Sequence, residues 1–424
     1  MSGRGSISDR VLHEVDEARD ELVELAASLV RVPTVNPPGE RYRECADLLG
    51  RRLAEYGFAV ELLQSEPEPD PLHPRWNVLG ARRGAAERPL VHLNGHLDVV
   101  PAGDGWTVDP FGGETKEGRL YGRGSADMKA GLAAAVIAAE ALRRAGASLA
   151  GTIEVSGTAD EESGGFAGVG WLAETGRISA TRTDHVIIPE PLGVDRVCIG
   201  HRGVYWCRVR AHGKIAHGSM PFLGSSAVDP LGRLLERVRT ELRPALAKRR
   251  TEMPVVPDEA RWATINVNAV AAGQAGMTPQ TPCVADLAEA IFDRRFLYEE
   301  GFEAARQEIL DLVAAIAVEN AGWKLEVEDL MVVHPTRTPA GDPLVMALED
   351  GILEVLGHEA TIVASPGTYD HKHVTRIGGV ESCVAYGPGV LEQAHQPDEW
   401  CAIQDMVDSA KVMALALLRL GVGR

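Results

Sequence analysis

The composition of this 424-residue chain excludes several classes of protein. Its formal net charge of −18 argues against a general nucleic-acid surface and against binding to anionic membranes. No apolar run reaches the roughly 18 residues that a membrane-spanning helix needs. The polar first ten residues lack the apolar stretch of a signal peptide.

The six cysteines are scattered and form no Cys-x-x-Cys pair. This distribution argues against a structural zinc held by thiolates and favours a reducing compartment, so we expect a cytoplasmic protein. The length of the chain predicts two or three domains.

Helical and strand patterns alternate through the first 200 residues. The apolar positions from Val11 to Val30 form one helical face, which Pro33 ends. The other elements that we predict here are helices at 40–56, 127–145 and 165–175 and strands at 58–63, 77–81, 89–93, 152–156 and 185–188. This alternation predicts an α/β fold with a mixed, mostly parallel sheet that helices cover on both faces.

The pattern changes near Gly200, where strands begin to dominate. We predict strands at 204–211, 262–270, 283–292 and 325–333 and helices at 227–246 and 299–319. This order describes a separate α+β domain, residues 201–333, inserted in a first domain made of residues 1–200 and 334–424.

A histidine and an aspartate lie close together in the sequence where the strand at 89–93 ends. His96 and Asp98 follow this strand, and their side chains point to the same side if the chain is still extended. A glycine-rich loop comes next, and Asp127 closes it at the start of a helix. Imidazole and carboxylate groups are ligands of zinc and manganese. A single His-x-Asp is equally typical of an ordinary surface loop.

Three further clusters also follow strands. They are the adjacent pair Glu161 and Glu162, then Glu190 between two prolines, and His395 after a Gly-Pro-Gly turn. One of two adjacent carboxylates can bind a metal while the other takes a proton from water. An isolated acidic turn is more often only solvated, but the four loops together supply two histidines and several carboxylates.

The order of these motifs resembles the two-metal aminoacylase and metallopeptidase family of acetylornithine deacetylase, succinyl-diaminopimelate desuccinylase and carboxypeptidase G. The matching motifs are His96-x-Asp98, Gly-Arg-Gly-x-x-Asp127-Met-Lys, Asp-Glu161-Glu162, Glu190-Pro and His395-x-Pro-Asp-Glu. The resemblance covers nearly the whole chain. It implies a zinc-exopeptidase-like catalytic domain and an inserted dimerisation or lid domain, and it specifies no single member of the family.

The resemblance also implies a set of metal ligands. Asp127 would bridge two divalent ions, His96 and Glu190 would complete one site, and Glu162 and His395 would complete the other. All five donors are nitrogen or oxygen, which favours zinc and also permits cobalt or manganese.

The catalytic roles follow from the same resemblance. Glu161 would be the general base that deprotonates a bridging metal-bound water and passes the proton to the leaving nitrogen. Asp98 would orient the His96 ring by accepting its second N–H. The Asp127–Met128 peptide bond is expected to be cis.

Substrate contacts are implied on both domains. His217 of the inserted domain would reach the active site of the partner subunit in a homodimer and stabilise the oxyanion. Arg295, with Arg294 as the rival, would bind a substrate carboxylate. The substrate loop would consist of Gly367, Thr368 and Asp370.

The chain departs from the family pattern at two places. The segment Met277–Cys283 lacks the asparagine that many members carry, and Tyr369 and the run 371–373 replace small residues. We interpret these changes as a preference for a larger, aromatic or acidic group near the carboxylate.

The expected function is hydrolysis of an amide between an acyl group and the amine of a small carboxylated compound. Three alternatives stay open: a dipeptidase or carboxypeptidase, a hydrolase of a non-peptide C–N bond such as a formylaminopyrimidine or an aromatic amine, and a catalytically inactive metal- or ligand-binding relative.

Overall fold

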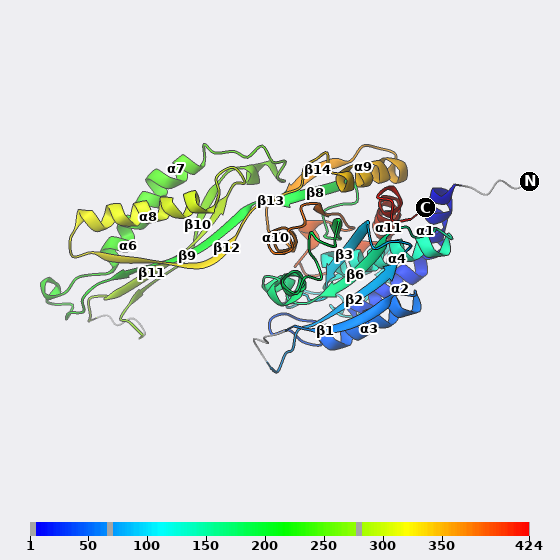
Figure 1. Ribbon diagram of the computed structural model, residues 1–424. Helices are drawn as coiled ribbons and strands as arrows, with labels where there is room; N and C mark the ends of the chain where they lie inside the picture. Colours follow the sequence, from blue (N-terminus) through cyan, green and yellow to red (C-terminus); the bar gives the residue numbers. More distant parts are fainter. Residues whose placement is uncertain (1–5, 66–70, 277–281, 424) are drawn as a thin grey trace, which may run out of the picture. The chain divides into compact units, whose positions relative to one another are not determined.

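The computed structural model describes residues 6–65, 71–276 and 282–423. The chain separates into two compact units (Figure 1). The first unit comprises Met1–Gly200, Thr338–Val363 and Tyr369–Arg424, and the second comprises His201–Arg337 and Ala364–Thr368. The role of the second unit in dimerisation stays a prediction.

A mixed sheet forms the centre of the first unit. Its neighbouring strands are, in order, β1 (Ala59–Gln64), β2 (Trp76–Arg83), β6 (Thr152–Thr158), β3 (Leu90–His96), β7 (His185–Ile188), β15 (Cys383–Ala385) and β8 (Arg196–His201), with β14 (Thr361–Ser365) also beside β8. The central strands β6, β3, β7 and β15 are parallel, and the pairs toward both edges are antiparallel. The predicted fold class is confirmed.

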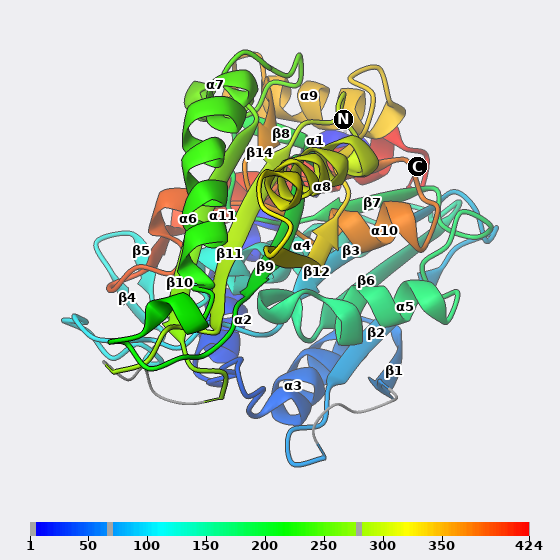
Figure 2. The ribbon, with the colours of Figure 1, turned by 90° about the vertical axis from the view of Figure 1, so that its left-hand side faces the viewer.

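Helices cover both faces of this sheet, which is why every residue of β3 and β6 is buried. Figures 1 and 2 show α2, α4 and α11 on one face and α5 and α10 on the other. The helices of this unit are α1 (Ile7–Glu17), α2 (Arg19–Val30), α3 (Tyr42–Glu55), α4 (Ala130–Arg144), α5 (Trp171–Glu174), α9 (Pro343–Leu356), α10 (His371–Arg376) and α11 (Ile403–Arg419).

The single helix expected from Val11 to Val30 is two helices that meet at Ala18. Ala18 leaves the helical conformation, with φ −85° and ψ 7°. Its side chain and the apolar residues on both sides of it are nevertheless buried. The apolar pattern therefore continues across the break, and periodicity alone could not show it.

A small antiparallel sheet joins two loops of the first unit. It consists of β16 (Trp400–Ala402), β5 (Arg119–Tyr121) and β4 (Glu114–Lys116), in that order. It pairs the segment that follows His395 with the segment that precedes Asp127. The sequence did not predict these strands, because three residues are too few to show an alternating pattern.

The second unit has an antiparallel sheet of its own. The strand order is β10 (Thr264–Gly273), β11 (Leu287–Phe296), β9 (Gly203–His212) and β12 (Lys324–Val333). Helices α6 (Val228–Arg237) and α8 (Phe302–Glu319) pack on it, α7 (Arg243–Leu246) contacts β10, and the short β13 (Thr336–Arg337) follows. Alternate residues of β9 and β11 are buried under these helices in a second core.

Among the described helices, none is both long and apolar enough to cross a membrane.

Candidate metal centre and catalytic residues

Adjacent parallel strands of the first unit end beside one another at the candidate site. β3 ends at His96, which pairs in register with Thr158 at the end of β6. β7 lies on the other side of β3 and leads into Glu190. The carboxyl ends of parallel strands meet at one edge of a sheet, and this edge is where α/β proteins place their binding sites.

Asp127 lies between two histidines. Its Oδ1 is 3.0 Å from His96 Nε2, and its Oδ2 is 3.5 Å from His395 Nε2. Glu162 Oε2 is 3.2 Å from the same His395 nitrogen. The ligand atoms of His96, Asp127 and Glu162 lie within 4.8 Å of one another. Each oxygen of one carboxylate thus faces a different histidine, and the Asp127–Met128 peptide bond is cis, as expected.

Burial makes these carboxylates costly to ionise without a cation. It raises the pKa of Glu162 to about 7, and the charge of Asp127 adds to the rise. Burial and the charge of Asp127 also hold the pKa of Glu190 well above its usual range. A divalent cation among these groups would offset both effects. The oxygen and nitrogen donors, with no thiolate among them, therefore fit divalent metal ions.

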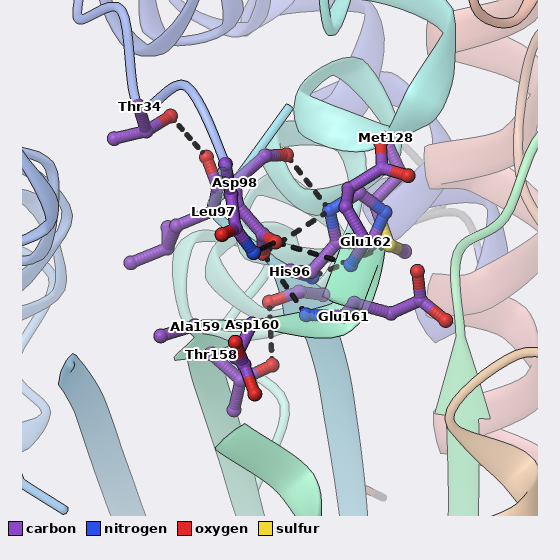
Figure 3. A network of polar contacts seen from close by, with 12 residues as sticks. Thr34, His96, Leu97, Asp98, Met128, Thr158, Ala159, Asp160, Glu161 and Glu162 are labelled. Atoms are coloured by element: carbon purple, nitrogen blue, oxygen red, sulfur yellow. Dashed lines mark hydrogen bonds and ion pairs between the residues drawn. The ribbon is translucent and has the colours of Figure 1, made fainter. Parts of the chain in front are cut away.

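Asp98 makes different contacts from those expected (Figure 3). Its carboxylate accepts the backbone N–H groups of Glu161 and Glu162, at 3.2 and 3.1 Å, and the Nδ2–H of Asn36 at 2.9 Å. His96 Nδ1 lies 3.0 Å from the main-chain carbonyl of Asp98 and 3.8 Å from its Oδ1. The carbonyl can only accept, so Nδ1 carries a proton, and Nε2 is the ring nitrogen that faces Asp127 and would bind a metal ion. Asp98 thus orients the ring through its backbone, while its side chain holds the glutamate turn.

Glu161 begins the turn that the Asp98 carboxylate holds. Its side chain extends away from Asp98 (Figure 3) and is 13% exposed. Its Oε1 lies 3.5 Å from Lys372 Nζ. The sequence singled out Glu161 but gave no reason to expect a lysine beside it.

Glu399 is a residue whose role the sequence did not reveal. Its fully buried carboxylate accepts the backbone N–H groups of Gly124, Ala126 and Asp127, at 3.0, 2.8 and 3.1 Å, and it forms an ion pair with Arg123. Glu399 closes the His395-x-Pro-Asp-Glu motif, and this position was the one available signal. It connects the loop of His395 to the loop of Asp127.

The two candidate arginines of the second unit differ in their contacts. Arg294 is fully buried and pairs with Glu300 and Glu308, so it stabilises the second core. Arg295 is partly exposed and makes a two-pronged pair with Asp293, at 2.7 and 3.0 Å. Binding of a substrate carboxylate by Arg295 stays a prediction.

His217 lies in an exposed loop of the second unit. The backbone N–H of Ser219 points at His217 Nδ1 from 3.2 Å, so the neutral ring carries its proton on Nε2. A protonated Nε2 is a suitable donor for an oxyanion. The candidate metal ligands belong to the first unit, and the role of His217 at that site stays a prediction.

The expected substrate loop divides between the units. Gly367 and Thr368 are half-buried in the second unit, and Asp370 is buried in the first, where its Oδ2 accepts from Asn94 Nδ2 at 3.3 Å. Burial of Asp370 favours a supporting role over direct contact with substrate.

The unusual residues beside Asp370 also point inward. Tyr369 Oη lies 3.2 Å from His371 Nδ1, and His373 Nε2 donates to the carbonyl of Gly164 at 2.7 Å. All three side chains are buried, which argues against the idea that they select a larger substrate group. Most of the segment that lacks the family asparagine lies outside the described residues.

Comparisons with known proteins identify the family. The sequence matches Peptidase family M20/M25/M40 over residues 92–419. Succinyl-diaminopimelate desuccinylase of Azoarcus sp. (strain BH72) is 30% identical over 409 residues, which cover 93% of this chain and 97% of the relative. The same enzyme of Methylorubrum extorquens (strain PA1) is 30% identical over 395 residues, covering 90% and 94%.

Solved structures share the fold at lower identity. Human carnosine dipeptidase 1 superposes with a TM-score of 0.73 at 18% identity, over 98% of this chain and 99% of that chain. A dinuclear metal-binding peptidase of the M20 family from Bacillus subtilis gives a TM-score of 0.66 at 17% identity, over 96% and 99%.

The family match and the curated relatives define a metal-dependent amidohydrolase that uses divalent ions. The chain belongs to Peptidase family M20/M25/M40, and the family prediction is confirmed.

Proposed function

We propose that this hydrolase cleaves the amide bond between a small acyl group, such as succinyl or acetyl, and the amine of a carboxylated compound. The observation that carries the proposal is the placement of Asp127 between His96 and His395, with Glu162 beside the second histidine. The desuccinylase relatives, which align over nearly the whole chain, support the choice of acyl substrates.

Five residues would hold two divalent cations. Asp127 would contact both, His96 and Glu190 would complete one site, and Glu162 and His395 would complete the other. Cations bound there would supply polarisation of the scissile carbonyl and a lower pKa of the attacking water. The donor set favours zinc, with cobalt and manganese as alternatives.

The chain's own side chains would move the proton and bind the substrate. Glu161 would take a proton from the attacking water and deliver it to the leaving nitrogen. Arg295 would bind the substrate carboxylate, and Gly367 and Thr368 would form the part of the substrate loop that contacts the substrate. The Nε2–H of His217 would stabilise the oxyanion of the tetrahedral intermediate.

A homodimer formed through the second unit is part of the proposal. Large apolar side chains are exposed around His217, which is unusual for a surface that faces water. They are Ile215, Met220, Phe222, Leu223 and Val228, and Phe222 is 78% exposed. A second copy of the chain would cover this surface and bring His217 to the partner's metal centre.

The cytoplasm is the proposed compartment. Among the described residues, none of the six cysteines forms a disulfide, and five of them are buried. Six buried or half-buried thiols outside disulfides are typical of proteins from a reducing environment.

The test compares purified wild-type protein with Glu161→Gln on a panel of N-succinyl and N-acetyl amino acids and dipeptides. We expect hydrolysis of acyl substrates, and a variant that keeps its metal but loses about 100-fold or more in kcat, because a general base contributes about that factor. Cleavage of dipeptides alone would make the protein a peptidase. Metal binding without turnover would favour a non-peptide C–N substrate or an inactive relative.

A further inference from the structure

Helix α10 holds the turn that carries Glu161. His373 Nε2, on this helix, donates to the Gly164 carbonyl at 2.7 Å. The Phe166 ring stands edge-on to the same imidazole, with ring centroids 5.0 Å apart. The turn is therefore held at two places. The Asp98 carboxylate binds its start, at the N–H groups of Glu161 and Glu162, and α10 binds its end, at Gly164.

Asp370 fixes the start of α10 against the same turn. Its side chain is 1% exposed, and Asn94 of β3 donates to its Oδ2. A Cβ added to Gly165 would approach Asp370 Oδ1 to 2.5 Å, so only glycine permits this contact. Gly165 also has a φ of +77°, which favours glycine. The helix and the turn therefore have one fixed arrangement.

Lys372, between these two anchors, directs its ammonium to Glu161. The Nζ–Oε1 distance is 3.5 Å, and the two side chains are only 8% and 13% exposed. Within the described part of the chain, this is the one ion pair of Lys372. A lysine is rarely buried without a partner, so the pair accounts for the burial of the amine.

We propose that Lys372 is a positioning residue for Glu161, an inference that rests on the proposed function of Glu161 as general base. The ammonium holds Oε1 and thereby fixes the carboxylate, so that Oε2 is the oxygen that takes and returns the proton. Lys372 acts through Glu161 and contacts no reacting atom itself. The resemblance had placed substrate contacts in this segment, whereas the geometry directs its one lysine to the base.

The test measures kcat, KM and bound metal for Lys372→Met and Lys372→Arg. We expect kcat of Lys372→Met to fall about 10- to 100-fold, because a misplaced catalytic group costs about that factor, while KM and metal content stay at the wild-type level. Lys372→Arg should recover most of the rate because it keeps the cation. The matched control is Lys411→Met, which removes a lysine paired with Asp16 at 2.6 Å between α11 and α1.

A second background separates positioning from substrate binding. In Glu161→Gln protein, Lys372→Met should cause no further loss of kcat and no change in the Kd of an N-succinyl amino acid. A weaker Kd, a raised KM with unchanged kcat, loss of bound metal, or a wild-type kcat would each overturn the proposal. Lys372→Gln replaces Lys372→Met if the latter does not fold. Failure of the general-base function itself would be seen separately, as full activity of Glu161→Gln alone.

Discussion

At the level of single residues, the Asp98 carboxylate holds both main-chain N–H groups of the glutamate turn. In Asp98→Asn, an NH₂ group replaces one of the two carboxylate oxygens. It then faces the N–H group of Glu161 or Glu162, and two donors cannot form a hydrogen bond. We expect the affinity for the metal that Glu162 is proposed to bind to fall about 10- to 100-fold, the usual effect of losing a group that orients a ligand. A chelator-competition titration measures it, with Asp16→Asn, whose side chain is 53% exposed, as the control. Unchanged affinity would contradict the role.

His373 gives the protein a pH dependence of its own. Burial and the neighbouring charge of Lys372 lower the pKa of His373 to about 4. The unfolded chain has the ordinary higher pKa and binds a proton first, so this group's stabilisation is present above about pH 6.5 and is lost as the pH falls toward 4.

The His373→Gln variant isolates that effect. Glutamine can still donate to the Gly164 carbonyl but does not titrate. Between pH 7 and pH 4, the wild-type free energy of unfolding should fall by about 3 kcal/mol more than that of the variant. Urea denaturation at both pH values measures the difference, and an equal fall for both proteins would show that folding does not lower the pKa of His373.

Sequence reasoning singled out candidate ligands but not the residues that support them. His96 and Glu162 follow strands, Asp127 closes a glycine-rich loop, and the structure brings the three together. Glu399 and Lys372 act through three-dimensional contacts with residues far away in the sequence. The motif position of Glu399 marks the residue but not its partners, and nothing in the sequence around Lys372 indicates Glu161.

At the level of elements, the small sheet of β16, β5 and β4 and the Glu399 carboxylate join two ligand loops. Glu399→Gln would leave the buried Arg123 guanidinium without its counter-charge. Loss of one partner of a buried ion pair costs about 3–5 kcal/mol, so we expect a lower free energy of unfolding and weaker metal binding. Urea denaturation and metal titration measure both. A stable variant with wild-type metal affinity would show that the sheet alone holds the loops.

Elements with a clear apolar pattern could be predicted, even the four-residue β7 (His185–Ile188), and the three-residue strands could not. Helix α4 begins three residues after the expected start because Asp127 and Met128 are not helical. The three-residue strands carry too few side chains for a pattern to emerge. Tertiary contacts decide such segments.

At the level of the whole molecule, each unit has its own core, and all five proposed ligands belong to the first. Chelation of the metal should therefore reduce hydrogen-exchange protection in the first unit and leave β9 to β12 unchanged. The free energy of protection in the first unit should fall by about 4 kcal/mol when the metal had been present at about 1,000 times its Kd. Equal loss in both units would contradict this assignment.

The proposed dimer makes a separate prediction at this scale. Phe222→Glu places a charge in the exposed apolar surface around His217. We expect sedimentation to show a monomer with little activity, because His217 would no longer reach a partner. Leu353→Glu, at a 50% exposed position of α9 in the first unit, is the control. A fully active monomer would exclude any role of His217 across subunits.

The proposed sharing of Asp127 by two cations can be measured as the number of metal ions per chain. Elemental analysis after equilibration with zinc should give two ions per chain for the wild type, one for Glu190→Ala and none for Asp127→Ala. Retention of two ions by Asp127→Ala, or a single ion in the wild type, would contradict the account.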